Sequence, residues 1–144
     1  HAGDTIPNFN MVTATGDTIS MYDVKSEYTL LYLQHPTCPT CHNVRNQMKD
    51  FPKLNKAIES GELKVVMIYF ENDPQVWSNY IRSAEANPKY VQGWNFDQTI
   101  DEQDLFDTRT IPYMFLLDKN KVVIKKDLLV NEIEPYIEHL RIGF

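Results

Sequence analysis

The only two cysteines of this 144-residue chain stand three positions apart, in Cys38-Pro39-Thr40-Cys41. They follow an apolar run and open a stretch with helical periodicity, so the first sulfur is expected at a helix N-terminus. Unpaired backbone N–H groups and the positive end of the helix dipole lower the pKa of a thiol at such a position. The second sulfur is then within reach of the first. The spacing therefore predicts a redox-active dithiol.

Two histidines flank the cysteine pair, His35 before it and His42 directly after it. A protonated imidazole near Cys38 would lower the pKa of that thiol further, and a neutral imidazole could shuttle its proton. Each histidine is equally well explained as a solvent-facing residue without a role. His35 and His42 are therefore candidate tuning residues.

Other chemistries use the same residue types. Cys38 to His42 fits C-x-x-C-H, the haem attachment motif, but this motif lies between two buried strand patterns rather than in a mainly helical chain. A zinc site would need four ligands within eight residues to converge, namely His35, Cys38, Cys41 and His42. A thiol peroxidase would need threonine or serine three residues before its reactive cysteine. That position holds His35 for Cys38 and Cys38 for Cys41, so the sequence disfavours a peroxidase. An inert buried pair is the structural alternative. We predict no metal and no organic cofactor.

Length and composition limit the choice of function. A chain of 144 residues forms one domain and buries about 68–70% of its unfolded surface, so it folds without disulfides. The net charge of −6 argues against binding to nucleic acid or to an anionic membrane. The longest apolar run, Val65 to Phe70, is too short to span a bilayer. Because the chain begins His1-Ala2-Gly3, we interpret it as a processed form or a recombinant fragment.

Two runs are apolar enough for strands buried on both faces, residues 28–34 and 64–70. Shorter β-prone runs around polar turns predict two hairpins: 10–13 with 18–20, and 113–117 with 121–126. The sequence thus alternates strands and helices, with the cysteines at the first strand-to-helix junction.

Helical periodicity appears in four places. After Cys41 one face is apolar, with Val44, Met48 and Phe51. The opposite face is polar: Arg45, Gln47 and Lys49. Pro52 breaks this helix, and further helices are predicted over 53–60 and near 75–86. The last helix starts at Asn131, with Glu134 completing a capping box and Pro135 in the first turn.

This order of elements resembles the thioredoxin fold. Thr110 to Asp118 looks like the cis-proline segment of that family, so Ile111-Pro112 is expected to be cis, with Ile111 pairing with the substrate backbone. Within the superfamily the chain is most similar to the TlpA-like thiol-disulfide oxidoreductases. The opening Gly3 to Phe9 and the region 74–107 carry that similarity.

The resemblance implies an α/β, thioredoxin-like fold: a mixed central sheet flanked by helices in one domain, 1–144, with an N-terminal hairpin about 1–26 and an insertion about 74–107. Cys38 would attack a protein disulfide or thiol partner, and Cys41 would resolve the adduct. Tuning or substrate contacts are expected from a further set: Pro39, Thr40, His35, His42, Ile111 and Pro112.

The resemblance also implies where and with what the protein works. We expect a monomer in a bacterial periplasm or cell envelope, with a leader or anchor removed, that exchanges electrons with protein thiols and an upstream redox partner. The alternative is a non-catalytic binding module that uses the groove at Ile111-Pro112.

Four positions depart from the pattern of the family. Thr37 and Gln34 stand where the family usually has aromatic residues. Tyr32 and Val44 occupy positions where relatives keep a buried acid or a glutamate. The usual proton acceptors near Cys41 are therefore replaced, and the sequence leaves the reducing or oxidising direction open.

Overall fold

A seven-stranded mixed sheet forms the centre of the computed structural model, which describes residues 1–106 and 110–144. The strand order is β2-β1-β5-β4-β3-β6-β7. The strands are β1 (Asn10–Thr13), β2 (Thr18–Ser20), β3 (Tyr28–Gln34), β4 (Leu63–Tyr69), β5 (Val91–Trp94), β6 (Tyr113–Asp118) and β7 (Val123–Lys126). β3 pairs in parallel with β4 and antiparallel with β6. The predicted thioredoxin-like fold with a mixed sheet is confirmed.

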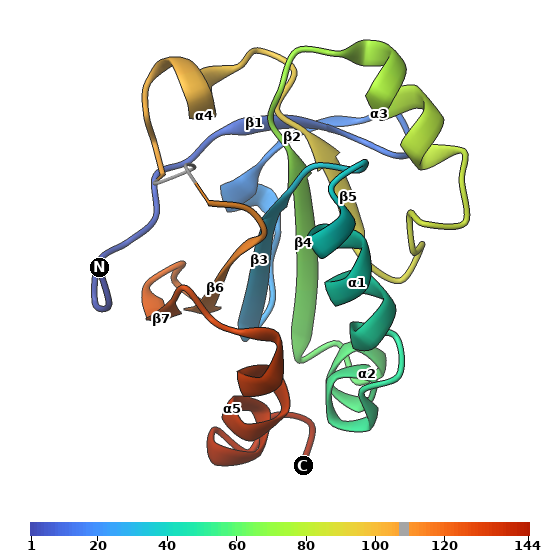
Figure 1. Cartoon of the computed structure of the whole chain (residues 1–144). Coiled ribbons are helices and arrows are strands. Elements are labelled where there is room, and N and C mark those ends of the chain that lie inside the picture. Colours follow the sequence, from blue (N-terminus) through green and yellow to red (C-terminus); the bar gives the residue numbers. More distant parts are fainter. Residues whose placement is uncertain (107–109) are drawn as a thin grey trace.

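The two central strands are buried on both faces, as their apolar runs predict. Successive side chains of a strand point to opposite faces, so each strand contributes to two cores. The helices are α1 (Pro39–Met48), α2 (Pro52–Glu59), α3 (Pro74–Ile81), α4 (Thr99–Glu102) and α5 (Ile133–His139). Figure 1 shows α1, α2 and α5 on one face of the sheet, and their apolar residues share one core with alternate residues of β3 and β4.

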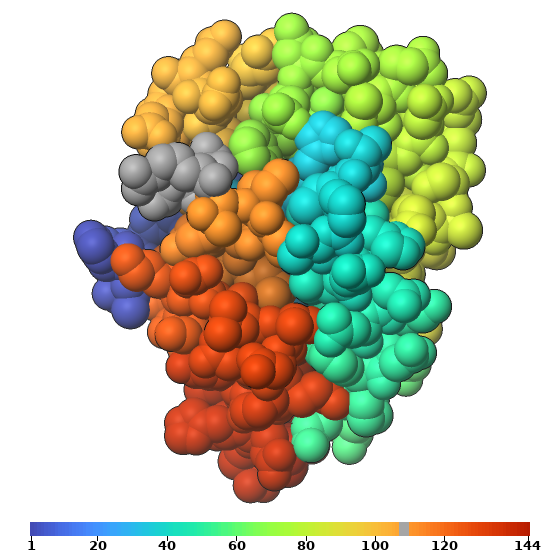
Figure 2. Space-filling view, viewed as in Figure 1, coloured from blue at the N-terminus to red at the C-terminus, as the bar shows by residue number. Residues whose placement is uncertain are grey.

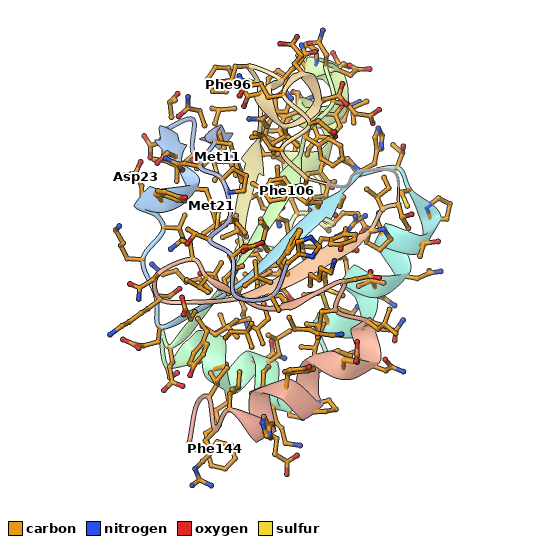
Figure 3. All side chains as sticks on the ribbon, turned by 90° about the vertical axis from the view of Figure 1, so that its left-hand side faces the viewer. Met11, Met21, Asp23, Phe96, Phe106 and Phe144 are labelled. Atoms are coloured by element: carbon orange, nitrogen blue, oxygen red, sulfur yellow. The ribbon has the colours of Figure 1, made fainter. Side chains whose placement is uncertain are left out.

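The other core lies between the sheet and the N-terminal segment. It includes Met11 of β1, Met21, Ile100 of α4 and Phe106. Met11 and Met21 are fully buried beside the β1–β2 hairpin, whereas Phe96 and Phe144 lie at the periphery (Figure 3). Because β1 pairs with β5, the N-terminal hairpin continues the central sheet rather than standing apart from it.

The region expected as an insertion begins with α3, which is shorter than predicted. This helix ends at Ile81 instead of near residue 86. Two local hydrogen bonds satisfy carbonyls of its last turn: the Ser83 hydroxyl donates to Tyr80 O at 2.7 Å, and Arg82 Nε donates to Ser78 O at 3.2 Å. Side chains that bond the backbone in this way compete with continuation of a helix.

Two elements of the same region were missed by the sequence analysis. β5 contains Gly93 and the polar Gln92, so it lacks a strand signal, yet it pairs with both β4 and β1. α4 is only one turn long, and the Asp97 carboxylate accepts the Thr99 N–H at its start. The expected end of the insertion, Asp107, lies outside the described residues.

The predicted capping box of the last helix is wrong. α5 begins at Ile133 after a 3-10 turn over Val130–Glu132, so Asn131 is not its N-cap. The Glu134 carboxylate instead accepts the Leu54 N–H of α2 at 2.8 Å. That N–H lies in the first turn of α2 and has no intrahelical partner, so it is a strong competitor for the glutamate. Pro135 lies in the first turn of α5, as predicted.

Candidate active site

Cys38 is the N-cap residue of α1, and Pro39 is the first residue of the helix. The Cys38 Sγ accepts the backbone N–H of Cys41 at 3.2 Å. This is the bond that a serine or aspartate oxygen makes at other helix starts, and it would strengthen if the sulfur carried a negative charge. Cys38 is half-buried, while Pro39 and Thr40 beside it are exposed. The first sulfur is therefore accessible and faces the positive end of the helix.

Cys41 lies on the inner face of α1 and is fully buried. Burial raises the pKa of its thiol to about 12, and the hydrogen bond with Cys38 acts in the same direction. The two sulfurs are not joined by a disulfide bond in this structure. The two sulfurs are thus distinct: Cys38 can be reached from solvent, and Cys41 is a protonated thiol behind it.

Tyr32 lies beneath the cysteine pair, at the position where relatives are expected to carry a buried acid. The side chain is fully buried, and its hydroxyl donates to Cys41 O at 3.0 Å. Burial raises the pKa of this phenol, so it stays neutral and cannot take the proton of Cys41 near neutral pH. Val44 packs into the apolar core on the same side.

Both flanking histidines bind glutamates near the ends of α3. His35 Nε2 lies 2.9 Å from Glu71 Oε2, and His42 Nδ1 lies 2.9 Å from Glu85 Oε1. Sequence reasoning selected the histidines but missed both glutamates, because only tertiary structure brings α3 beside α1. In the described part of the chain, no three histidine, cysteine or acidic side chains are grouped so that they could hold a metal ion.

Arg45 is the largest error of the sequence analysis at this site. Helical periodicity places it on the exposed face of α1, whereas its side chain is only 4% exposed. It is buried because Gln34, at the end of β3, accepts a hydrogen bond from Arg45 Nη1. Gln34 and Arg45 are thus two polar residues that can be buried because each is the hydrogen-bond partner of the other. The one signal in the sequence was the i,i+4 spacing from Cys41, which places Arg45 on the same helix face as that cysteine.

The Ile111-Pro112 peptide bond is cis, as expected from the resemblance. The register pairs Tyr113 with Leu33, so Pro112 precedes β6 at the sheet end where β3 leads into the cysteine loop. Figure 2 shows the orange surface of this segment beside the cyan surface of the start of α1. Ile111 and Pro112 are half-buried, and the structure brings them to the same end of the sheet as Cys38.

The fold and the Cys-x-x-Cys at the start of α1 define a thioredoxin-like protein. The chain belongs to the AhpC/TSA family, whose sequence profile matches residues 2–132. It is 25% identical over 145 residues to methylamine utilization protein MauD of Paracoccus versutus, covering 99% of this chain and 67% of that protein. No described helix is long and apolar enough to cross a membrane.

Solved structures agree with this assignment. A thioredoxin-like protein from Bacteroides caccae is 29% identical with a TM-score of 0.91, and the match covers 96% of this chain and 50% of that one. This chain thus spans half the length of that protein. The thioredoxin domain of a thiol-disulfide oxidoreductase from Bacteroides vulgatus is 16% identical, with a TM-score of 0.81 and coverage of 97% of both chains, and shares the fold.

Proposed function

We propose that this protein is a thiol-disulfide oxidoreductase that exchanges electrons with protein thiols and disulfides through Cys38 and Cys41. The observation that carries the proposal is the asymmetry of the two sulfurs. Cys38 is accessible at the start of α1, where its sulfur accepts the Cys41 N–H at 3.2 Å, and Cys41 is fully buried behind it. The AhpC/TSA family supports this reading.

The reaction consists of two exchange steps. The Cys38 thiolate attacks one sulfur of a substrate disulfide, so that a Cys38–substrate bond forms and the substrate disulfide breaks. The released thiolate takes up a proton. Cys41 then loses its proton and attacks Cys38, which closes the Cys38–Cys41 disulfide and releases the second substrate thiol. The substrate gains two electrons, and the dithiol of the protein loses them.

The exposed neighbours of Cys38 would contact the substrate. Pro39 and Thr40 lie exposed on the helix start, and we assign Ile111 and Pro112 to hold an extended substrate segment beside the sulfur. These roles follow from the resemblance and from the sheet register that brings Pro112 to this end. The histidines would tune the site through their glutamate partners.

We further propose that residues 1–144 act as one monomeric domain in the periplasm or cell envelope of a bacterium, with an upstream redox partner and without a metal or organic cofactor. The hairpin about 1–26 and the insertion about 74–107 would be parts of this domain. The printed name of the Bacteroides vulgatus protein, a thiol-disulfide oxidoreductase, supports redox work on thiols.

The test is a trapping experiment with Cys41→Ser. Without the resolving sulfur, a mixed disulfide between Cys38 and a protein thiol substrate should accumulate and migrate as a higher-mass band without reductant. Cys38→Ser is the matched control and should trap nothing. The unmodified protein should also reduce insulin disulfides when supplied with a dithiol. Absence of both adduct and turnover would overturn the proposal and leave a non-catalytic binding module.

A further inference from the structure

The buried guanidinium of Arg45 lies at the end of α1 that carries the cysteines. Cys41 and Arg45 are four residues apart, so they share one face of the helix with Cβ atoms roughly 5–6 Å apart. Long side chains on a helix point toward its N-terminus. Here Arg45 Nη2 donates to Pro36 O at 3.2 Å, two residues before Cys38. The positive charge therefore lies under the loop that leads to the dithiol.

Most partners of this guanidinium are neutral. Gln34 and the Pro36 carbonyl accept its hydrogen bonds, and its centre lies 5.5 Å from the Tyr80 ring centroid. Arg45 Nε is buried and has no hydrogen-bond partner in the described part of the chain. A buried cation with incomplete compensation is costly, so a further negative charge nearby would be stabilised.

One carboxylate offsets the charge only in part. Glu85 Oε2 lies 3.5 Å from Arg45 Nη2, the Glu85 side chain is 42% exposed, and the same carboxylate binds His42 at 2.9 Å. Solvent screens an ion pair with so exposed a partner. Glu85 therefore neutralises the positive charge of Arg45 only in part, and this charge still acts on the groups buried around it.

The titratable groups that face Arg45 differ in whether they can become negative. Tyr32 on β3 and Tyr80 on α3 have pKa values raised by burial, so both phenols stay neutral. Burial also raises the pKa of the Cys41 thiol, but the charge of Arg45 works against this effect. Besides Glu85, the cysteines are the groups that can take a negative charge during the reaction.

We propose that Arg45 is a positioning residue that stabilises the thiolate of the reduced Cys38–Cys41 pair and thereby makes the pair more oxidising. The inference rests on the proposed redox function and specifies its direction. Reduction by glutathione breaks the Cys38–Cys41 bond, forms one glutathione disulfide and moves two electrons to the protein. Of the two glutathione protons, one stays on a cysteine and the other is released if the second cysteine remains a thiolate. The neutral protein disulfide gains nothing from Arg45, so the equilibrium shifts toward the dithiol.

The experiment measures the equilibrium constant of the full chain with glutathione at pH 7, together with thiolate absorbance during a pH titration. Arg45→Met removes the charge and keeps an apolar stem. It should favour the protein disulfide by about tenfold, equivalent to about 30 mV, and delay thiolate formation to higher pH. Arg45→Lys keeps the charge and should stay within about threefold of the wild-type value.

Glu85→Gln should move the equilibrium constant in the direction opposite to Arg45→Met. A general loss of folded structure would not produce this opposite shift. Removing the carboxylate leaves Arg45 less compensated, so the equilibrium should move about threefold toward the dithiol. The same substitution is made in a His42→Gln background, so that only a shift that persists there is assigned to Arg45.

Two results would overturn the inference. One is a folded Arg45→Met protein whose equilibrium constant stays within twofold of wild type or matches that of Arg45→Lys. The second applies if Arg45→Met does not fold: it is a Glu85→Gln protein whose equilibrium constant with glutathione is unchanged or has moved toward the disulfide. Failure of the proposed function is distinguishable, because then the unmodified protein would form no Cys38–Cys41 disulfide in any glutathione buffer.

Discussion

His35 and Thr37 form a closed turn directly before Cys38: the Thr37 backbone N–H donates to His35 Nδ1 at 3.1 Å. An N–H group can only donate, so Nδ1 is unprotonated and the ring proton is on Nε2, facing Glu71 at 2.9 Å. The His35 carbonyl accepts the Cys38 N–H at 3.1 Å. His35 thus orders the two residues before α1 in its neutral form, and a cationic His35 would lose the bond to Thr37.

His35→Phe should lower the free energy of unfolding by about 1 kcal/mol, because the Thr37 N–H loses its acceptor while edge packing against Tyr69 is retained. Urea denaturation measures this change. The matched control is His42→Phe, which removes only a half-exposed pair with Glu85 and should change stability by less than about 0.5 kcal/mol. Equal losses in the two variants would contradict a structural role for His35.

Stability of the reduced protein should fall as the pH rises above 9. The Cys41 pKa is raised from 9.0 to about 12 in the folded protein, so between these values the unfolded chain has lost a proton that the folded chain keeps. The contribution of Cys41 to the free energy of unfolding is complete below pH 9 and is lost as the pH rises through 12. The free energy of unfolding falls by up to about 1.4 kcal/mol per pH unit in this range.

The control for this pH dependence is Cys41→Ser, which lacks the titrating thiol. Buried tyrosines such as Tyr69 and Tyr90 have pKa values raised to about 12, so they lower the free energy of unfolding at high pH equally in both proteins. The difference between the two urea-denaturation series therefore isolates Cys41. Coincident slopes between pH 9 and 11 would show that Cys41 does not carry the effect.

Gly93→Ala should destabilise the fold by about 1–3 kcal/mol through overpacking. A Cβ at this position would stand 2.5 Å from Met11 Sδ and 3.0 Å from Ile68 Cδ1, so the Met11 and Ile68 side chains would have to shift to admit it. Thermal unfolding measures the loss. In a double-mutant cycle, Met11→Ala should recover part of it, and strictly additive losses would refute the steric explanation.

Strong local patterns predicted the central elements well. The apolar runs of β3 and β4, the two hairpins and the helix after Cys38 needed no tertiary information, because burial on both faces and turn chemistry are visible over a few residues. The errors concern weak or competing signals. β5 has no strand pattern of its own and is defined by its pairing with β4. Glu134 does not cap its own helix, because its carboxylate accepts the otherwise unpaired Leu54 N–H of α2.

The candidate site shows the same division. Cys38, Cys41 and the cis bond before Pro112 were predicted from spacing and resemblance. Arg45, Glu71 and Glu85 were missed, since each owes its role to a partner more than ten residues away in the sequence. Periodicity sorts residues into apolar and polar faces and cannot show that a polar residue is buried against another.

The sequence by itself determined that a dithiol stands at the first strand-to-helix junction of an α/β chain, because the spacing of two cysteines and the periods of strand and helix are local properties. Only the tertiary structure decided how the two sulfurs differ and which charges surround them. Burial of Cys41, the neutral Tyr32 beneath it and the partly compensated Arg45 beside it depend on packing of α1 against β3 and the segment after α3, and electrostatic effects follow such distances rather than sequence order.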